Sequence, residues 1–439
     1  MLKVAGGTAS ASVIKRYLAA QDPRHHGHLT PHLAPHPIPP HLPPMSLPNQ
    51  PIYLDNHATT PVDPRVLQAM RPFWEAQFAN PASAEHVMGR AAAEAVEAAR
   101  EHIAELIGAS AAEIILTSGA TEANNLAIKG AARFAASQGD PRRRIITLAT
   151  EHKCVLESVR DLAQEGFEPV ILPVGADGLL DPEVLRRACD ENTLLVSIMA
   201  VNNEIGVIQD LAALGAIAKE AGAAFHTDAA QAAGRIPLDV GEIQADLLSL
   251  SGHKVYGPRG IGALYVRRRP RMRLAPLFSG GGQERGLRSG TLPAPLVVGF
   301  GEACRIAAIE GLLDSGRIAG QREIFLNKLR AEIPGLVVNA EAAPRVSGNL
   351  NLTFPGGVTA QSLMAGAPQL CVSTGSACSS AEIEPSYVLQ AIGLEPAAAR
   401  ATLRIGMGRF TSPAEAERAA ASLAAAWHRA ASATDKTSD

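Results

Sequence analysis

The stretch EIILTSGATEANNLAIKGAARFAA, residues 113–136, decides the class of fold that the sequence predicts. Its first five residues suit a short buried strand, and the chain then turns through Gly119 into an alanine-rich helix. Similar apolar runs recur along the chain, and they predict strands at residues 144–150, 194–200, 223–227, 246–250 and 262–266. Because helix-length segments separate most of these strands, the predicted fold class is α/β, with a mostly parallel sheet covered on both faces.

The alternation of helix and strand changes after about residue 305, which predicts a second, smaller domain. Longer helices then accompany short strands such as GNLNLTF (348–354), and Ser412 is expected to begin the last helix in a capping box with Glu415. The predicted organisation is a disordered His/Pro-rich extension (1–48), a large domain (62–305) and a small C-terminal α/β domain (306–439) on which residues 49–61 pack.

The first 48 residues differ in composition from the rest of the chain. They hold six of the 13 histidines, and nine prolines fall between Pro23 and Pro48. Such a segment cannot bury a core and is expected to be disordered. Three interpretations stay open: a metal-binding tract, a weak organelle-targeting sequence in residues 1–20, or an extension upstream of a true start at Met45. We favour Met45, because ordered patterning begins only at PIYLDNHATTP (51–61).

The composition of the chain limits its partners and its compartment. A net charge of −3, with 46% hydrophobic and 19% charged residues, is typical of a globular protein and gives no reason to expect nucleic acid or a membrane as partner. The five cysteines form no CxxC and show no repeated spacing, which argues against a disulfide framework or a structural zinc site and favours a reducing compartment. They are Cys154, Cys189, Cys304, Cys371 and Cys378.

Polar side chains follow five of the predicted strands, at the point where each strand ends. In open α/β sheets, ligands bind beyond the carboxyl ends of the strands, so we expect these groups to share one crevice. The groups are Ser118–Thr121, Glu151 and His152, Asn202–Glu204, Asp228 and Gln231, and Ser251–Lys254.

The chemistry of this set points to pyridoxal phosphate. Lys254 is a candidate Schiff-base lysine, and Asp228 is a candidate partner that keeps the ring nitrogen protonated. The glycine turn at 118–121 opens a helix N-terminus, which suits a phosphate. Gln231 is placed to bond the ring oxygen, and His152 to stack on the ring and exchange protons. Each of these residues alone is a weak signal. The prediction of a pyridoxal-phosphate site rests on their occurrence together, in order, at the ends of successive strands.

From about residue 51 to about 425 the chain resembles the cysteine desulfurases, fold-type-I pyridoxal-phosphate enzymes of the class V aminotransferase superfamily. The match is specific, because many motifs occur in order and at family-like spacing. It is closest to the first group of the family, whose cysteine lies in an SSGSAC-like loop. The matching motifs include LDNHATTPVDPRV, TSGATEANNLAIKG, TEHKCVLES, VNNEIGVIQD, HTDAAQAAG, SGHKVYGPRGIGALYVRR, RSGTLP and GSACSS.

The resemblance implies a role for each matching residue. Lys254 would form the bond to the cofactor, Asp228 would pair with the pyridine nitrogen, Gln231 would bond the ring oxygen, and His152 would stack on the ring and serve in acid–base steps. Asn203 and Arg404 would bind the substrate carboxylate. The phosphate would be held by Ala120, Thr121, Ser251 and His253, together with Thr291 of a neighbouring subunit in a homodimer.

The resemblance makes Cys378, in STGSACSS (373–380), the nucleophile. Its thiolate would attack the sulfur of L-cysteine, so that L-alanine leaves and a persulfide remains on Cys378. The small residues and the glycine around it predict a mobile arm, with Cys378 too far from Lys254 for direct contact at rest. Cys378 is also a candidate transient ligand of an iron–sulfur cluster, and no resident metal is expected.

The expected function is therefore a cysteine desulfurase that supplies sulfur for iron–sulfur cluster assembly, with tRNA thiolation as a further destination. Its expected partners are L-cysteine and sulfur-acceptor proteins such as a cluster scaffold. The expected compartment is the cytoplasm, or the mitochondrion if residues 1–20 are a presequence. Two other interpretations stay open: a relative such as a selenocysteine lyase, and a non-catalytic sulfur-transfer partner that keeps the fold.

Overall fold

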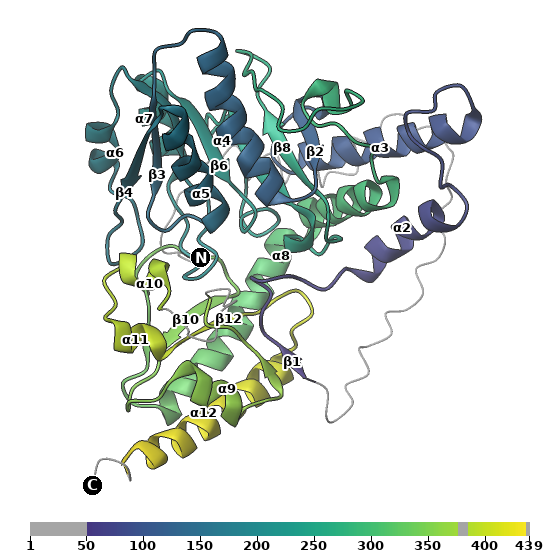
Figure 1. The fold of residues 1–439 in the computed structure, drawn as a ribbon. Coiled ribbons are helices and arrows are strands. Elements are labelled where there is room, and N and C mark those ends of the chain that lie inside the picture. Colours follow the sequence, from purple (N-terminus) through teal and green to yellow (C-terminus); the bar gives the residue numbers. More distant parts are fainter. Residues whose placement is uncertain (1–50, 376–384, 436–439) are drawn as a thin grey trace, which may run out of the picture. The chain divides into compact units, whose positions relative to one another are not determined.

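The computed structural model describes residues 51–375 and 385–435 of the chain (Figure 1). The predictions made for residues 1–48 and for Cys378 lie outside the described residues. Within the described part, α-helices and strands alternate from residue 114 to residue 228, and two further strands precede the long helix α8, Ala294–Glu332. The α/β class predicted from the sequence is confirmed.

A seven-stranded sheet forms the centre of the structure, in the order β2-β8-β7-β6-β5-β3-β4. β8 is antiparallel to both of its neighbours, and the other neighbouring strands are parallel, so the predicted mostly parallel sheet is confirmed. Its strands are β2 (Ile114–Thr117), β3 (Arg144–Leu148), β4 (Glu168–Leu172), β5 (Thr193–Ser197), β6 (Ala224–Asp228), β7 (Leu247–Ser251) and β8 (Gly262–Val266).

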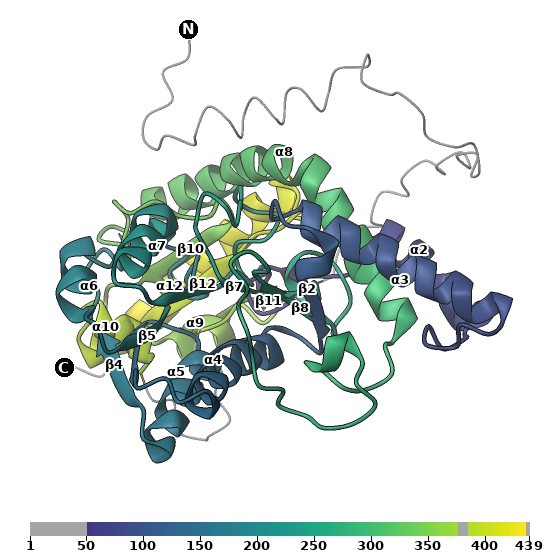
Figure 2. The ribbon, with the colours of Figure 1, turned by 90° about the horizontal axis from the view of Figure 1, so that it is seen from above.

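Helices cover both faces of this sheet, as Figure 2 shows. Ile145 and Ile146 are neighbours on β3 and point to opposite faces, as successive strand residues do. Ile145 packs with buried side chains of α4 (Ala120–Ser137) and α5 (Lys153–Leu162). Ile146 belongs to the cluster on the other face, which includes side chains of α3 (Val87–Glu105), α7 (Leu211–Glu220) and the first half of α8.

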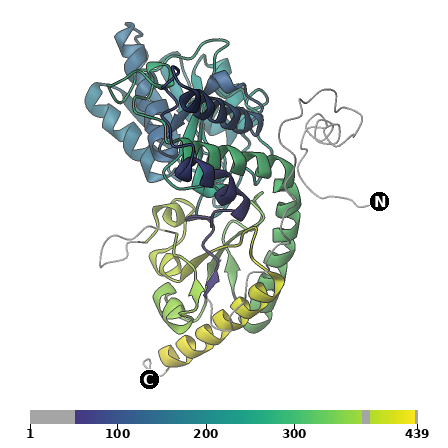
Figure 3. The same ribbon diagram turned by 90° about the vertical axis from the view of Figure 1, so that its right-hand side faces the viewer.

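A second hydrophobic cluster, which we call the small core, gathers around two short sheets. The sheets are β12-β10-β9, which is antiparallel, and the parallel pair β1-β11. The second half of α8 packs into the small core, and α12 lies beside it (Figure 3). The cluster is built from β1 (Ile52–Tyr53), β9 (Val337–Val338), β10 (Asn349–Thr353), α9 (Ala360–Gly366), β11 (Leu370–Cys371), β12 (Thr402–Gly406) and α12 (Pro413–Asp435).

The predicted domain boundary between residues 305 and 306 falls inside helix α8. Its buried residues from Ala294 to Ala307 belong to the cluster on the seven-stranded sheet, and those from Ile318 to Leu329 to the small core. Residues Ile52 and Leu54 also pack in the small core. The division into domains 62–305 and 306–439 stays a prediction. The short helices α2 (Pro64–Glu75), α6 (Pro182–Ala188), α10 (Tyr387–Ala391) and α11 (Pro396–Arg400) complete the described elements.

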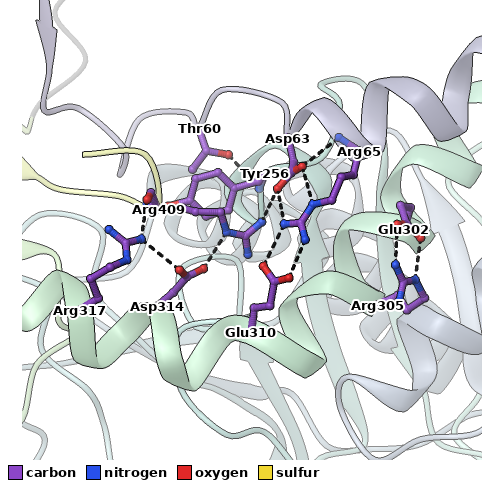
Figure 4. Close-up of polar contacts among 10 residues, drawn as sticks. All are labelled: Thr60, Asp63, Arg65, Tyr256, Glu302, Arg305, Glu310, Asp314, Arg317 and Arg409. Atoms are coloured by element: carbon purple, nitrogen blue, oxygen red, sulfur yellow. Dashed lines mark hydrogen bonds and ion pairs between the residues drawn. The ribbon is translucent and has the colours of Figure 1, made fainter. Parts of the chain in front are cut away.

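A network of ion pairs on α8 fastens the start of α2 to the loop between β12 and α12 (Figure 4). Arg409 Nη1 contacts Asp63 Oδ2 at 2.8 Å, and Arg409 Nε contacts Asp314 Oδ2 at 2.7 Å. Asp63, the N-cap of α2, also pairs with Arg65, which reaches Glu310. Burial alone would raise the pKa of Asp63, but its hydrogen bonds from Arg65 and Arg409 outweigh this and lower it.

We expect Arg409→Met to destabilise the protein, because it leaves the buried Asp63 carboxylate with one partner fewer. Breaking a buried ion pair costs about 3–5 kcal/mol, and since Arg65 still contacts Asp63 we expect roughly 2–3 kcal/mol in urea-induced unfolding. The control is Arg71→Met, which breaks a pair with Glu75 whose side chains are 75% and 64% exposed. That change should cost less than about 0.5 kcal/mol, and equal effects of the two variants would contradict the prediction.

Candidate active site

The carboxyl ends of the central strands line a cavity of about 720 Å³. Ser373 and Gly375, which precede Cys378 in the chain, also line it, whereas Cys378 itself lies outside the described residues. Thr291 is exposed and is not among the described residues that line the cavity. The predicted site residues that do line it are Ala120, Thr121, His152, Asn203, Asp228, Gln231, Ser251, His253, Lys254 and Arg404.

Lys254 follows β7 in a single 3-10 turn, Gly252–Lys254. Its Nζ donates hydrogen bonds to the carbonyl oxygens of His57 at 2.5 Å and Ala58 at 2.8 Å. Burial, together with the positive charges of Arg235 and Arg404, lowers the pKa of Lys254 to about 7. A substantial fraction of the amine is therefore neutral near pH 7, as a nucleophilic lysine requires.

Asp228 ends β6 as a buried carboxylate that is held by two hydrogen bonds. Its Oδ1 accepts from the backbone of Ala230 at 2.9 Å, and its Oδ2 accepts from Asn124 Nδ2 at 2.7 Å. Both donors are neutral, so neither of these bonds places a counter-charge on the Asp228 carboxylate. This is the property that a partner of a protonated ring nitrogen needs.

Gln231 is already bonded within the protein. Its Nε2 donates to the carbonyl oxygen of His57 at 2.8 Å, and its Oε1 accepts from Arg235 Nη1 at 2.5 Å. A side-chain amide has two N–H groups, so one of them is left for a further acceptor.

His152 is the N-cap of α5, and its Nδ1 accepts from the backbone N–H of Cys154 at 3.2 Å. The neutral ring therefore carries its proton on Nε2. Burial lowers the pKa of His152, and the charge of Lys254 adds to the effect while Asp228 opposes it. Cys154 packs beside the core and also lines the cavity, with its Sγ 3.0 Å from His152 Nδ1. Burial raises the pKa of Cys154 to about 12, so it stays a thiol.

The N-terminus of α4 forms the part of the cavity wall that is suited to bind an anion. Gly119 is its N-cap, with a φ of 150° and no side-chain cap within the described part. Open amides at the start of a helix attract a phosphate. Ser251 and His253 line the cavity beside them. Burial and the nearby charge of Lys254 lower the pKa of His253 to about 4, so its ring is neutral at pH 7.

Arg404, on β12, brings a guanidinium from the small core into the cavity. Its Nη2 pairs with Asp55 Oδ1 at 2.7 Å, and its Nη1 donates to the carbonyl oxygen of Asn203 at 2.9 Å. Arg404 Nε and Asn203 Oδ1 are buried and have no hydrogen-bond partner among residues 51–375 and 385–435. An unpartnered guanidinium N–H is suited to a further carboxylate.

Three residues of the site were missed by the sequence analysis: Asp55, His57 and Asn124. Asp55 pairs with Arg404, and Asn124 holds Asp228. The fully buried His57 contacts Gln231 and Arg235, and burial with the charge of Arg235 lowers its pKa well below the ordinary value. The motif LDNHATTP (54–61) was a signal for two of them, but it assigned no role to either residue.

The residues present fit pyridoxal phosphate. The cavity offers open helix amides for a phosphate, a fixed carboxylate for a ring nitrogen and a lysine amine of lowered pKa, each from a different strand end. In the described part of the chain, no cluster of three or more His, Cys, Asp or Glu side chains is placed to hold a metal ion. No described helix is both long and apolar enough to cross a bilayer.

Comparisons with known proteins agree with this chemistry. The family model Aminotransferase class-V matches residues 52–418. Cysteine desulfurase IscS of Rickettsia bellii is 52% identical over 83% of this chain and 88% of the relative, and the mitochondrial cysteine desulfurase of Arabidopsis thaliana is 53% identical over 84% and 81%.

Solved structures show the same relationship. A NifS-like protein aligns with a TM-score of 0.78 and 34% identity, over 85% of this chain and 98% of that one. The structure described as SspA in complex with cysteine aligns with a TM-score of 0.73 and 40% identity, over 82% and 99%. With these matches and the cavity that fits the cofactor, the chain belongs to the class V aminotransferase family and, within it, to the pyridoxal-phosphate-dependent cysteine desulfurases.

Proposed function

We propose that this chain removes sulfur from L-cysteine in the cavity around Lys254, with Cys378 as the first sulfur acceptor. The observation that carries the proposal is that Ser373 and Gly375 line the same cavity as Lys254 and Asp228. Gly375, the last described residue of this stretch, stands three positions before Cys378 in the sequence. We therefore expect the Cys378 thiol to reach a substrate held in the cavity.

The cofactor would be held from three directions. Asp228 would hold the proton on the ring nitrogen, Gln231 would bond the ring oxygen, and His152 would lie against the ring. When bound, pyridoxal phosphate supplies an electron-accepting ring that stabilises negative charge at the substrate α-carbon. The phosphate would be held by Ala120, Thr121, Ser251 and His253, with Thr291 reaching it from a second subunit.

The substrate would be oriented by Arg404 and Asn203. Arg404 lines the cavity, and Asp55 fixes one side of its guanidinium. Lys254, with a pKa of about 7, can take up and release a proton near neutral pH at the substrate carbon atoms. His152 Nε2 is the second proton carrier of the site.

Sulfur transfer would then need only the Cys378 thiolate. Its Sγ attacks the sulfur of L-cysteine, so an S–S bond forms while the substrate Cβ–S bond breaks. The electron pair of the broken bond stays with the carbon skeleton, which takes up a proton and leaves as L-alanine. Cys378 keeps the added sulfur as a persulfide, and an acceptor protein such as an iron–sulfur scaffold or a tRNA-thiolation carrier would remove it. A transient ligation of an iron–sulfur cluster by Cys378 belongs to the same proposal.

We further propose that the protein works as a homodimer in the cytoplasm. Trp74, Phe78 and Val87, on and between α2 and α3, are 62%, 73% and 69% exposed. Apolar side chains so exposed are typical of an interface. Thr291 lies outside the cavity of its own chain, which fits a role in the site of a second copy. Relatives from Rickettsia support the cytoplasm, whereas the Arabidopsis relative keeps the mitochondrial alternative open.

Cys378→Ala should lower sulfide release from L-cysteine in the presence of a reductant by at least 100-fold, because it removes the sulfur acceptor. Binding of the yellow cofactor should be unchanged, since Cys378 takes no part in holding it. Cys189→Ala is the matched control and should keep full activity. Full activity of Cys378→Ala would contradict the mechanism, and activity restricted to selenocysteine would favour a selenocysteine lyase.

Labelling of Lys254 in the apoprotein by trinitrobenzenesulfonate should rise with pH around a midpoint of about 7, because only the neutral amine reacts. Peptide mass spectrometry measures this rate residue by residue. Arg404→Gln removes one of the charges that lower the Lys254 pKa, so its midpoint should move upward. A midpoint near the ordinary lysine value of about 10.4 would contradict the prediction.

The double variant Trp74→Glu/Phe78→Glu should dissociate into monomers in sedimentation velocity experiments, because it places charges on the proposed interface. Cofactor-dependent activity should fall when the dimer dissociates, since each site would lose Thr291 of the second copy. The control is Val337→Glu, at a side chain that is 51% exposed on β9. A wild-type monomer would contradict the proposed homodimer.

A further inference from the structure

Glu204, in the turn after β5, is buried and has no role in the mechanism proposed above; its side chain is 2% exposed. Its backbone is fixed from two sides, because its N–H donates to Asn202 Oδ1 at 2.8 Å and its carbonyl oxygen accepts from Asn349 Nδ2 at 3.0 Å. Asn349 lies on β10, so the turn is tied to the small core. The carboxylate of Glu204 therefore projects from a rigid support.

One oxygen of this carboxylate holds Ser386. Ser386 Oγ donates to Glu204 Oε2 at 2.6 Å and accepts from the backbone N–H groups of Val388 and Leu389, as the N-cap of α10. The serine hydroxyl has a single hydrogen, so its only donated bond goes to Glu204. Ser386 stands two residues beyond the segment 376–384.

The same oxygen lies against Gly375, at the other end of that segment. A Cβ atom on Gly375 would stand 2.7 Å from Glu204 Oε2, and Gly375 has a φ of +91°, so only glycine fits here. Its N–H donates to Ser373 Oγ at 3.0 Å, and the Ser373 backbone pairs with Arg404 on β12. Glu204 Oε2 thus bonds Ser386 and leaves no room for a side chain at Gly375, so it lies close to the described residues on both sides of the segment 376–384.

The charges around Glu204 are consistent with a carboxylate held by hydrogen bonding. Burial raises the pKa of Glu204, whereas the Ser386 hydrogen bond and the positive charges of Arg404 and Lys153 oppose the rise. Within residues 51–375 and 385–435, the group that bonds the carboxylate is the neutral hydroxyl of Ser386.

We propose that Glu204 is a positioning residue, which holds Ser386 by a hydrogen bond, packs against Gly375 and so fixes the two described stems between which Cys378 lies in the sequence. This inference rests on the proposed function of Cys378. Fixing both ends of a short segment raises the effective concentration of its thiol at the substrate. Loss of the anchor should slow transfer of sulfur to Cys378 without changing how the cavity binds cofactor or substrate.

The test uses Glu204→Ala in the full chain, with Glu415→Ala as matched control. Glu415 makes a similar pair, since its Oε2 accepts from Ser412 Oγ at 2.8 Å at the start of α12. In the apoprotein, hydrogen exchange of peptides covering 373–375 and 385–391 should be faster in Glu204→Ala than in wild type. In the holoenzyme, the KM for L-cysteine should be kept while single-turnover persulfide formation on Cys378, read by mass spectrometry, falls roughly 10-fold or more.

If Glu204→Ala does not fold, Ser386→Ala carries the same test with Ser412→Ala as its control, because each removes one helix cap. Unchanged exchange at both stems, or persulfide formation at the wild-type rate, would overturn the anchoring role alone. Failure of the wild type to form a persulfide on Cys378 would overturn the proposed function as well. The two failures are therefore distinguishable.

Discussion

The contact on which the site depends is that of Lys254 Nζ with the carbonyl oxygens of His57 and Ala58. Lys254 lies in the turn that follows strand β7 of the seven-stranded sheet, and the two carbonyls follow Ile52 and Leu54, which pack in the small core. The contact thus joins the two cores at the amine that we propose to react. The two carbonyl acceptors stabilise the ammonium form of Lys254. Burial and the positive charges of Arg235 and Arg404 have the larger, opposite effect and lower the pKa of Lys254 to about 7. The lysine is held in place without being fixed as a cation.

The turn that carries Lys254 is also stabilised by contacts of the neighbouring residue Tyr256. Tyr256 has a φ of 65°, a conformation that costs a non-glycine residue energy, and its N–H donates to Thr60 Oγ1 at 2.9 Å. Its hydroxyl accepts from the backbone of Arg409 at 2.5 Å, and the Arg409 guanidinium stands over its ring at 4.4 Å. The ion network in Figure 4 therefore reaches the lysine turn through Tyr256. A change at Arg409 would be felt at the active site without any contact to substrate.

The sequence predicted the polar site residues that follow the strands. It did not predict the contacts between residues of the two hydrophobic cores. His57 meets Gln231, which is 174 residues away, and no local pattern encodes such a contact. Strand β4 was not predicted, because it contains Pro169 and lacks a continuous run of buried apolar residues. Proline is tolerated in β4 because β4 lies at the edge of the sheet. Helix α3 begins at Val87, and its N-cap is His86, a residue outside the usual set of caps, so the sequence carries no ordinary signal for its start.

Arg404 shows how binding and sulfur transfer share one support. Its guanidinium holds Asp55 and the Asn203 carbonyl, while its backbone pairs with Ser373 at the start of the Cys378 stem. The Arg404 guanidinium is buried, and Asp55 supplies a carboxylate that pairs with it. The guanidinium is therefore already oriented before a substrate binds. A substrate carboxylate that reached the free Nε would join this pair rather than create it. Because Arg404 carries both the guanidinium and the backbone partner of Ser373, a substrate carboxylate held there would lie close to Ser373, which stands five positions before Cys378 in the sequence.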